Sequence, residues 1–428
     1  MMKIMISKKN IADKIYFLLM FVAIYCSHDT LLFGTNGNNN FILLRKIIPF
    51  ILVVCLAAFG NWKVPSPKQI IVAVCFIAFP FFSAIFNGEP LENYIYRATI
   101  ILCALMFVWT ARENEFQVNF NKIMYFFSIW SVCTFVLANV FPSLVTIFPV
   151  ISNTKGVPFH YMLFSSVTYN YSYGLMRNFC IFREPGMFAI FLAVAFLFEL
   201  VFTKKPNIKH IIVYTIAMAS TLSTAGYIIL GCLYLYMFAS SSKFKFKYVL
   251  IVGFVFLVLL NLDAGIFSSD SALWSKFTEG SNNYGSWLSR LVGVTKNWEI
   301  ALQNPLFGLG RYALYDVVLA KEGVYRVMDN TNTMMINFAA YGLLYGFVNG
   351  VGVFLFLHRH NKKILMTIFG FLILFTAFSN EDMGQNILYY YIVLTGLVSY
   401  EVKKKKKWEI DWQQPAVLDV QESRISAE

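Results

Sequence analysis

The chain has 428 residues, of which 58% are hydrophobic and 14% are charged, and its formal net charge is +12. Soluble domains carry about 25% charged residues, so this composition excludes an ordinary soluble protein and favours one that crosses a membrane several times. The positive charge does not indicate nucleic-acid binding, because Lys and Arg form small clusters between hydrophobic segments, as cytoplasmic loops do.

Long apolar segments follow one another from the N-terminus, and a helix of about 20 apolar residues crosses the hydrocarbon core of a bilayer. The first six are predicted at Ile15–Phe33, Phe41–Phe59, Ile70–Phe86, Tyr94–Ala111, Ile123–Phe141 and Pro185–Phe202. Six more are predicted at His210–Thr221, Ala225–Ser240, Tyr248–Leu262, Asn332–Leu357, Ile364–Phe378 and Ile387–Tyr400. The sequence therefore predicts an all-α, polytopic membrane domain of twelve spans over residues 1–407.

The distribution of basic residues predicts the orientation of these spans. Clusters lie at Lys8/Lys9, Lys63/Lys68, Lys204–Lys209, Lys243–Lys247, Arg359–Lys363 and Lys403–Lys407. Because positive loops stay in the cytoplasm, both termini are predicted to be cytoplasmic, with residues 408–428 as a polar tail. The first apolar segment lacks a small-residue cleavage site, which favours an uncleaved anchor over a signal peptide.

Two connecting segments on the predicted outer side are long, at residues 142–184 and 263–331. Loops of this length are usually functional. Apolar residues recur at helical spacing over Trp287–Leu302, which predicts an amphipathic helix on the membrane surface. Arg290 lies at the edge of its apolar face, and Lys296 points away.

Five ionisable residues fall in the outer half of the predicted bilayer: His28, Asp29, Arg45, Lys46 and Arg97. A cation deep in the membrane costs about 2.5–3.5 kcal/mol on insertion scales. These side chains either extend to the outer headgroups or line a polar cavity that opens outward. Cations in such a cavity suit an anionic ligand, and a lipid pyrophosphate is the obvious anion at that place.

Further cations lie on the same side at Arg177, Arg183, Arg290 and Arg311. Gly308 and Gly310 precede Arg311, and two readings of them stay open. They form an ordinary turn, or they let backbone amides approach a ligand closely.

Arg183 and Glu184 stand directly before the span that begins at Pro185. In one interpretation, Pro185 fits the first helical position and Glu184 complements the helix dipole. In the other, Glu184 is a general base and Arg183 is an anion ligand.

Several short motifs between Arg177 and Tyr345 occur in a recognisable order. They are the segment Phe182–Ala189, the turn Thr221–Tyr227, and Arg290 followed by the run Asn304–Gly310. In order and membrane placement they resemble the O-antigen polymerase and O-antigen ligase superfamily of bacterial envelope glycosyltransferases. In the ligase branch a His precedes the position of Asn332, and here that residue is Thr331, which favours the polymerase.

The resemblance implies transfer of a growing glycan from undecaprenyl pyrophosphate to a second lipid-linked repeat unit, at the outer face of the bacterial inner membrane. The donor and acceptor are both lipid-linked glycans, membrane lipids surround them, and a chain-length regulator is a candidate further partner. A ligase or a flippase for lipid-linked oligosaccharide is the alternative, although a flippase would need charges in the cytoplasmic half of the bilayer as well.

The implied chemistry assigns roles to particular residues. Developing charge on the pyrophosphate needs fixed cations, and the acceptor hydroxyl needs a general base. Glu184, Arg183 and Arg290 are the candidate catalytic residues, with Asp329, Glu381 and Asp382 as rival bases. The candidate pyrophosphate ligands are Arg311, Arg177, Arg97, Arg45, Gly308, Gly310 and Asn332. The Cys and His residues lack metal-site spacing, so no metal or other cofactor is expected.

Overall fold

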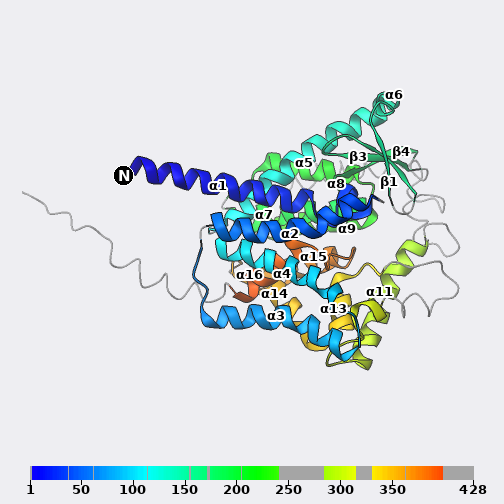
Figure 1. Ribbon diagram of the computed structural model, residues 1–428. Coiled ribbons are helices and arrows are strands. Elements are labelled where there is room, and N and C mark those ends of the chain that lie inside the picture. The colour runs from blue at the N-terminus through cyan, green and yellow to red at the C-terminus, as the bar shows by residue number, and fades with distance from the viewer. Residues whose placement is uncertain are drawn as a thin grey trace, which may run out of the picture.

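The computed structural model of the protein describes most of the chain as helix, with a small antiparallel sheet (Figure 1). The described residues are 2–36, 38–60, 62–112, 114–153, 156–170, 174–203, 205–240, 284–314, 330–361 and 363–398. The predicted span Tyr248–Leu262, the tail 408–428 and Asp329 lie outside them.

The helices of the first half are α1 (Met2–Tyr25), α2 (Asn39–Phe59), α3 (Pro67–Phe86), α4 (Glu92–Thr110), α5 (Glu115–Val140), α6 (Pro142–Val145) and α7 (Pro185–Phe202). Those that follow are α8 (Ile208–Ser220), α9 (Thr224–Ser240), α11 (Tyr284–Gln303), α13 (Thr333–Tyr341), α14 (Leu343–His358), α15 (Ile364–Phe378) and α16 (Ile387–Val398). Among the described residues, five helices are long and apolar enough to cross a membrane: α2, α3, α4, α5 and α7. The total of twelve spans stays a prediction.

Successive long helices run in alternating directions, which gives the bundle two ends with different residues (Figure 1). At the end where α2, α4, α7 and α14 finish lie Lys63, Arg112, Lys205 and Arg359; we call it the basic end. At the opposite end, which we call the site end, α1, α3, α5 and α15 finish. The basic loops are therefore separated from the charged residues described below by the length of the bundle.

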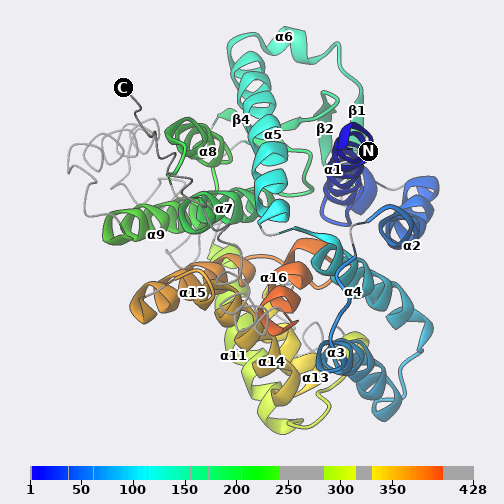
Figure 2. The same cartoon turned by 90° about the vertical axis from the view of Figure 1, so that its left-hand side faces the viewer.

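The helix α7 lies near the middle of the bundle when it is viewed along the helices (Figure 2). In its most apolar stretch 83% of the residues are buried, against 17% in α2 and 28% in α3. Helices that are apolar all round but packed by neighbours on every side belong to a core, whereas exposed apolar faces suit a lipid environment. Thus α7 is the central element, and Arg183 and Glu184 directly precede it.

The first predicted span ends earlier than its apolar run. The helix α1 stops at Tyr25, and the chain then turns through a π-helical segment, η1 (Leu31–Thr35). Here the backbone is hydrogen-bonded to the segment that precedes α7. The Leu31 N–H donates to the Ile181 carbonyl at 2.8 Å, and the Arg183 N–H donates to the Asp29 carbonyl at 2.9 Å. The prediction that His28 and Asp29 lie within a span is wrong: both follow the helix.

The predicted span Asn332–Leu357 is also wrong as a single helix, because it is divided at Gly342 into α13 and α14. Gly342 has φ +89°, and a Cβ there would clash with the Leu306 carbonyl. The Leu343 N–H instead donates to the Pro305 carbonyl at 2.8 Å. The turn 304–310 thus supplies the hydrogen bonds that the break removes, as buried backbone groups require.

The first long loop is not wholly irregular, and the all-α prediction needs correction there. It contains β1 (Val150–Ser152), β2 (Pro158–Tyr161), β3 (Ser166–Asn170) and β4 (Leu175–Cys180), antiparallel in that order. In the β3–β4 pair Val167 faces Asn178, with a register shift between Ser166 and Val167. In the second loop, the helix predicted over Trp287–Leu302 is confirmed as α11.

Candidate functional site

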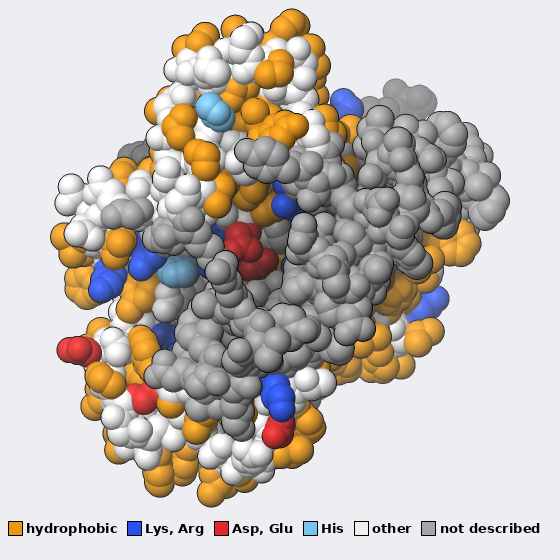
Figure 3. Space-filling model, turned by 90° about the vertical axis from the view of Figure 1, so that its right-hand side faces the viewer, with side chains coloured by type: hydrophobic (Ala, Val, Ile, Leu, Met, Phe, Trp, Pro, Cys, Tyr) orange, Lys and Arg blue, Asp and Glu red, His pale blue; other side chains and the backbone are white. Residues whose placement is uncertain are grey.

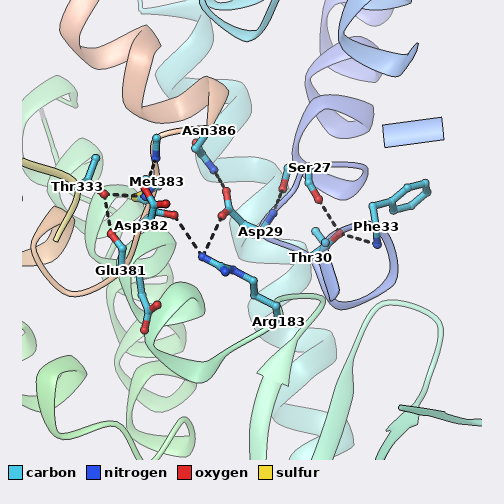
Figure 4. Close-up of polar contacts among 12 residues, drawn as sticks. Ser27, Asp29, Thr30, Phe33, Arg183, Thr333, Glu381, Asp382, Met383 and Asn386 are labelled. Atoms are coloured by element: carbon cyan, nitrogen blue, oxygen red, sulfur yellow. Dashed lines mark hydrogen bonds and ion pairs between the residues drawn. The ribbon is translucent and has the colours of Figure 1, made fainter. Parts of the chain in front are cut away.

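Charged side chains from well-separated segments meet at the site end. Three of these segments are the turn after α1, the residues before α7, and the connection between α15 and α16 (Figure 4). The fourth is the start of the turn that follows Gly310, where Arg311 pairs with Asp382. On this face of the molecule, acidic side chains lie at the bottom of a hollow with basic and His side chains nearby (Figure 3). The hollow is therefore a polar site at the end of an apolar bundle.

Arg183 lies between two of the acidic segments (Figure 4). Its Nη2 is 3.8 Å from Oδ1 of Asp29 and donates a hydrogen bond of 3.2 Å to the Asp382 carbonyl. Asn386 donates to the second carboxylate oxygen of Asp29. The Nε of Arg183 has no hydrogen-bond partner among the described residues. The guanidinium is thus held in place while it keeps a donor for a further acceptor.

Arg311 is held by both its side chain and its backbone. Its Nη2 pairs with the Asp382 carboxylate. The Glu89 carboxylate accepts from the N–H of Arg311 at 3.1 Å and from the next two N–H groups at 2.8 and 2.9 Å. An acceptor at the start of a helical turn satisfies donors that would otherwise be unpaired. Glu89 was not singled out from the sequence, where it is one of two acids, with Glu92, in the short connection between two apolar segments.

The two glycines before Arg311 are required by close packing. Gly308 and Gly310 have φ of +66° and +87°, and a Cβ on Gly310 would clash with the Glu89 carboxylate. The Gly308 N–H donates to the Asn304 carbonyl at 3.0 Å, and the Gly310 N–H donates to the Ala340 carbonyl at 3.1 Å. Both amides are used within the protein, so these glycines position Arg311.

Arg97 lies deeper, on α4, and is 4% exposed. Its guanidinium is 5.1 Å from the ring centroid of Tyr341, which is cation–π distance. Within the described part of the chain, its Nη1 and the hydroxyls of Tyr341 and Tyr345 have no hydrogen-bond partner. A buried cation among unpaired hydroxyls provides positive charge beneath Arg311 and Arg183.

Glu184 and Glu381 form a carboxyl pair at the start of α7. Glu381 is 4% exposed and shares a hydrogen bond with Glu184. Burial and the charge of Glu184 raise the pKa of Glu381 well above its ordinary value, although Arg183 and Arg290 act against this. Burial next to a second carboxyl therefore favours the protonated form of Glu381.

The pKa values of the remaining ionisable groups are shifted in different directions because the surroundings of these groups differ. Burial raises the pKa of Asp29 to about 6 despite the nearby Arg183 charge. Burial also acts on Asp382, but the Arg311 charge and the Gly384 N–H outweigh it and lower the pKa of Asp382. Burial, together with the Arg183 and Arg45 charges, lowers the pKa of His28 to about 3. Asp382 is thus the fixed anion of the site, and His28 is neutral.

Three predicted ligands are tied to the fold. Arg177 donates to the carbonyls of Thr221 and Leu222 at 3.0 and 3.2 Å, so it holds the α8–α9 turn. Arg45 donates to the Phe33 and Gly34 carbonyls at 3.2 and 3.1 Å and holds η1. Asn332 caps α13 by accepting from the Met335 N–H at 3.0 Å.

Arg290 lies on α11 and contributes to the same site through its electrostatic effect on Glu381. The structure therefore places Arg183 and Arg290 where their charges lower the pKa of Glu381, and Arg311 on the neighbouring Asp382. Among the described residues, no three His, Cys, Asp or Glu side chains are grouped so that they could hold a metal ion. No protein-family model, curated protein or solved structure matches the chain.

Proposed function

We propose that this protein polymerises undecaprenyl-pyrophosphate-linked oligosaccharide repeat units at the outer face of the bacterial inner membrane. The observation that carries the proposal is the convergence of Arg183 and Arg311 near the Glu184–Glu381 pair, whose Glu381 is buried, at the end of an apolar bundle opposite its basic loops. Cations suit the pyrophosphate, a carboxylate suits the acceptor hydroxyl, and the positive-inside rule makes the site end the outer one.

The leaving group determines the role of the arginines. The bond between the anomeric carbon and the pyrophosphate oxygen breaks, and the electron pair stays on the pyrophosphate. Arg183 and Arg311 offer fork-shaped donors to those oxygens, and Arg97 adds a fixed charge beneath them. The guanidinium groups of Arg183 and Arg311 are each already oriented by a carboxylate, so little reorganisation is needed when charge develops.

The carboxyl pair acts on the acceptor. A hydroxyl of the acceptor sugar attacks the anomeric carbon, and its proton passes to a carboxylate. Glu184 is the better acceptor of this proton, because it is only half-buried, whereas Glu381 is buried and its pKa is raised well above the ordinary value. Asp382 is a poorer base, because its ion pair with Arg311 lowers its pKa. Arg290 helps to balance the charge of the pair.

Gel profiling of surface glycan in a strain that lacks the gene tests this function. We expect single repeat units on the surface glycolipid, and full-length ladders after complementation with the wild-type gene but not with Arg183→Ala or Glu184→Gln. Arg112→Ala at the basic end is the matched control and should restore the ladder. Polymer left on the lipid carrier would indicate a ligase instead, and lipid-linked units trapped inside the cell would indicate a flippase.

Cysteine labelling tests the orientation separately. Cysteines placed at exposed positions, such as Leu163 in the β2–β3 turn and Tyr169 on β3, should react with an impermeant thiol reagent from the outside. A cysteine in place of Lys63 should be protected. Labelling with the opposite pattern would put the arginines in the cytosol and refute the proposal.

A further inference from the structure

Two short polar segments border the Glu184–Glu381 pair, and together they contain several buried polar atoms. One segment is residues 331–332, before α13, and the other is residues 379–380, after α15. The Thr333 hydroxyl joins them, because it donates to the Glu381 carbonyl at 2.6 Å and accepts from the Met383 N–H at 2.7 Å (Figure 4). The two segments are thus held at a fixed separation beside the carboxyl pair.

Asn380 is the most unusual of these residues. It is 3% exposed, and neither its amide oxygen nor its amide nitrogen has a hydrogen-bond partner in the described ranges. A Cβ on Gly186 would lie 3.2 Å from Nδ2 of Asn380 and 2.8 Å from Oε1 of Glu381. The amide therefore lies next to the Glu381 carboxyl, at the first turn of α7. A buried polar group left unpaired costs about 1–3 kcal/mol, so this placement needs a reason.

Asn332 is in a similar position on the other segment. It is fully buried, and its Oδ1 caps α13. Its Nδ2 has no partner among the residues that the structure describes, and the same holds for the hydroxyls of Thr331 and Ser379. By contrast, the equally buried Asn349 on α14 is satisfied, because it donates to the Tyr345 carbonyl and accepts from the Tyr389 hydroxyl.

We infer that Asn380 and Asn332 form a neutral subsite that binds hydroxyl groups of the acceptor sugar and holds them against the Glu184–Glu381 pair. The inference rests on the proposed function. A primary amide both donates and accepts, as a sugar hydroxyl does. The phosphate oxygens have the arginines as better partners, so neutral amides beside the carboxyls suit the uncharged part of the substrate. The reacting hydroxyl is thereby placed within reach of Glu184.

Three variants separate this role from a structural one. Asn380→Ala removes both unpaired amide atoms. Asn332→Ser removes the free N–H donor but keeps an oxygen for the helix cap, because Ser and Asn are comparable N-caps. Asn349→Ala is the control, since it removes a buried amide whose hydrogen bonds are made within the protein. The first two should unfold at nearly the wild-type temperature, and the control should unfold at a lower one.

Binding is measured on the full-length protein in detergent micelles with two probes. One is the free repeat-unit oligosaccharide, released by mild acid from the lipid carrier of the deletion strain, and the other is undecaprenyl pyrophosphate without sugar. We expect Asn380→Ala and Asn332→Ser each to weaken oligosaccharide binding about 3- to 10-fold, the value of one neutral hydrogen bond. Binding of undecaprenyl pyrophosphate should stay unchanged, and Asn349→Ala should bind both probes as the wild type does.

The outcomes distinguish the subsite from the function on which it rests. Wild-type oligosaccharide affinity in both Asn380→Ala and Asn332→Ser overturns the subsite, and so does an equal loss for both probes, which would indicate general damage. Selective loss for the oligosaccharide supports it. If the wild-type gene restores no polymer but the oligosaccharide still binds through Asn380, the subsite stands and the polymerase assignment fails.

Discussion

The ion pair between Arg183 and Asp29 connects the turn after α1 to the start of α7, and a double-mutant cycle can measure it. The variants are Arg183→Met, Asp29→Asn and the two combined. Met keeps much of the length of the Arg side chain without its charge, and Asn keeps the oxygen that accepts from Asn386. The cycle isolates the charge pair because the surrounding contacts are preserved.

The expected energies follow from burial. Asp29 is 1% exposed, so Arg183→Met leaves a buried carboxylate without its main cation, which costs about 3–5 kcal/mol. Asp29→Asn costs less, about 1–3 kcal/mol, because the Arg183 guanidinium still donates to the Asp382 carbonyl. In the double variant both charges are gone, and the total loss should fall short of the sum by about 1–3 kcal/mol.

The assay is denaturant titration of the full-length protein in mixed micelles, with surface polymer profiled by gel in the deletion strain. The control cycle uses Arg112 and Asp13 at the basic end, whose side chains are 34% and 40% exposed and 2.6 Å apart. Exposed pairs of this kind contribute up to about 1 kcal/mol. We expect strong coupling only for Arg183 with Asp29, and polymer lost in every variant that lacks Arg183.

Two results would refute the reasoning. Additive losses of stability in the double variant would mean that Asp29 does not stabilise Arg183. Normal polymer in a stable Arg183→Met, Asp29→Asn protein would mean that the guanidinium has no part in the reaction, whatever it does for the fold.

Further predictions concern pH, backbone and metal. Burial raises the pKa of Asp29 from 3.8 to about 6 on folding. Protonation of Asp29 therefore contributes its full stabilisation of the folded state below about pH 4, and this contribution is lost as the pH rises through 6. Relative to Asp29→Asn, the wild type should therefore lose roughly 1 kcal/mol of stability between pH 5 and pH 7; equal pH profiles would contradict this. Gly310→Ala should destabilise the protein by about 1–3 kcal/mol and shorten the polymer, because φ is +87° there and Glu89 occupies the space of the Cβ. Gly350→Ala, in a helix with nothing within 4 Å of the new Cβ, should be neutral or mildly stabilising. Polymerisation by the purified protein should survive EDTA, since guanidinium groups take the place of a divalent ion; activity that collapses on chelation and returns with magnesium would argue against this.

Much of the helical framework follows from local sequence. The apolar segments Pro185–Phe202 and Ile364–Phe378 are helices with those same bounds, and the spacing of apolar residues indicated most of α11. The length of an apolar run overestimates the length of the helix where a tertiary contact ends that helix. The apolar run that ends at Phe33 extends beyond the last residue of α1. Gly342 interrupts a segment that hydropathy alone predicts to be one continuous helix.

The site was predictable in its residue types but not in its contacts. Arg183 and Glu184 were identified because they directly precede an apolar span, and Arg311 because it follows Gly308 and Gly310 in the second long loop. That Glu89 holds the backbone at Arg311, or that Asp382 shares Arg183 with Asp29, depends on pairs separated by about 150 residues or more along the chain. The strands β1–β4 were missed because they are three to six residues long, too short for a clear alternating pattern.

The break at Gly342 limits how this protein can be recombined with a relative. Because the turn 304–310 completes the hydrogen bonding of two half-helices, neither segment is a self-contained module. A chimera that exchanges residues 284–311 alone would leave polar backbone of α13 and α14 without its partners. Crossover points that preserve folding should instead transfer residues 284–358 as a block.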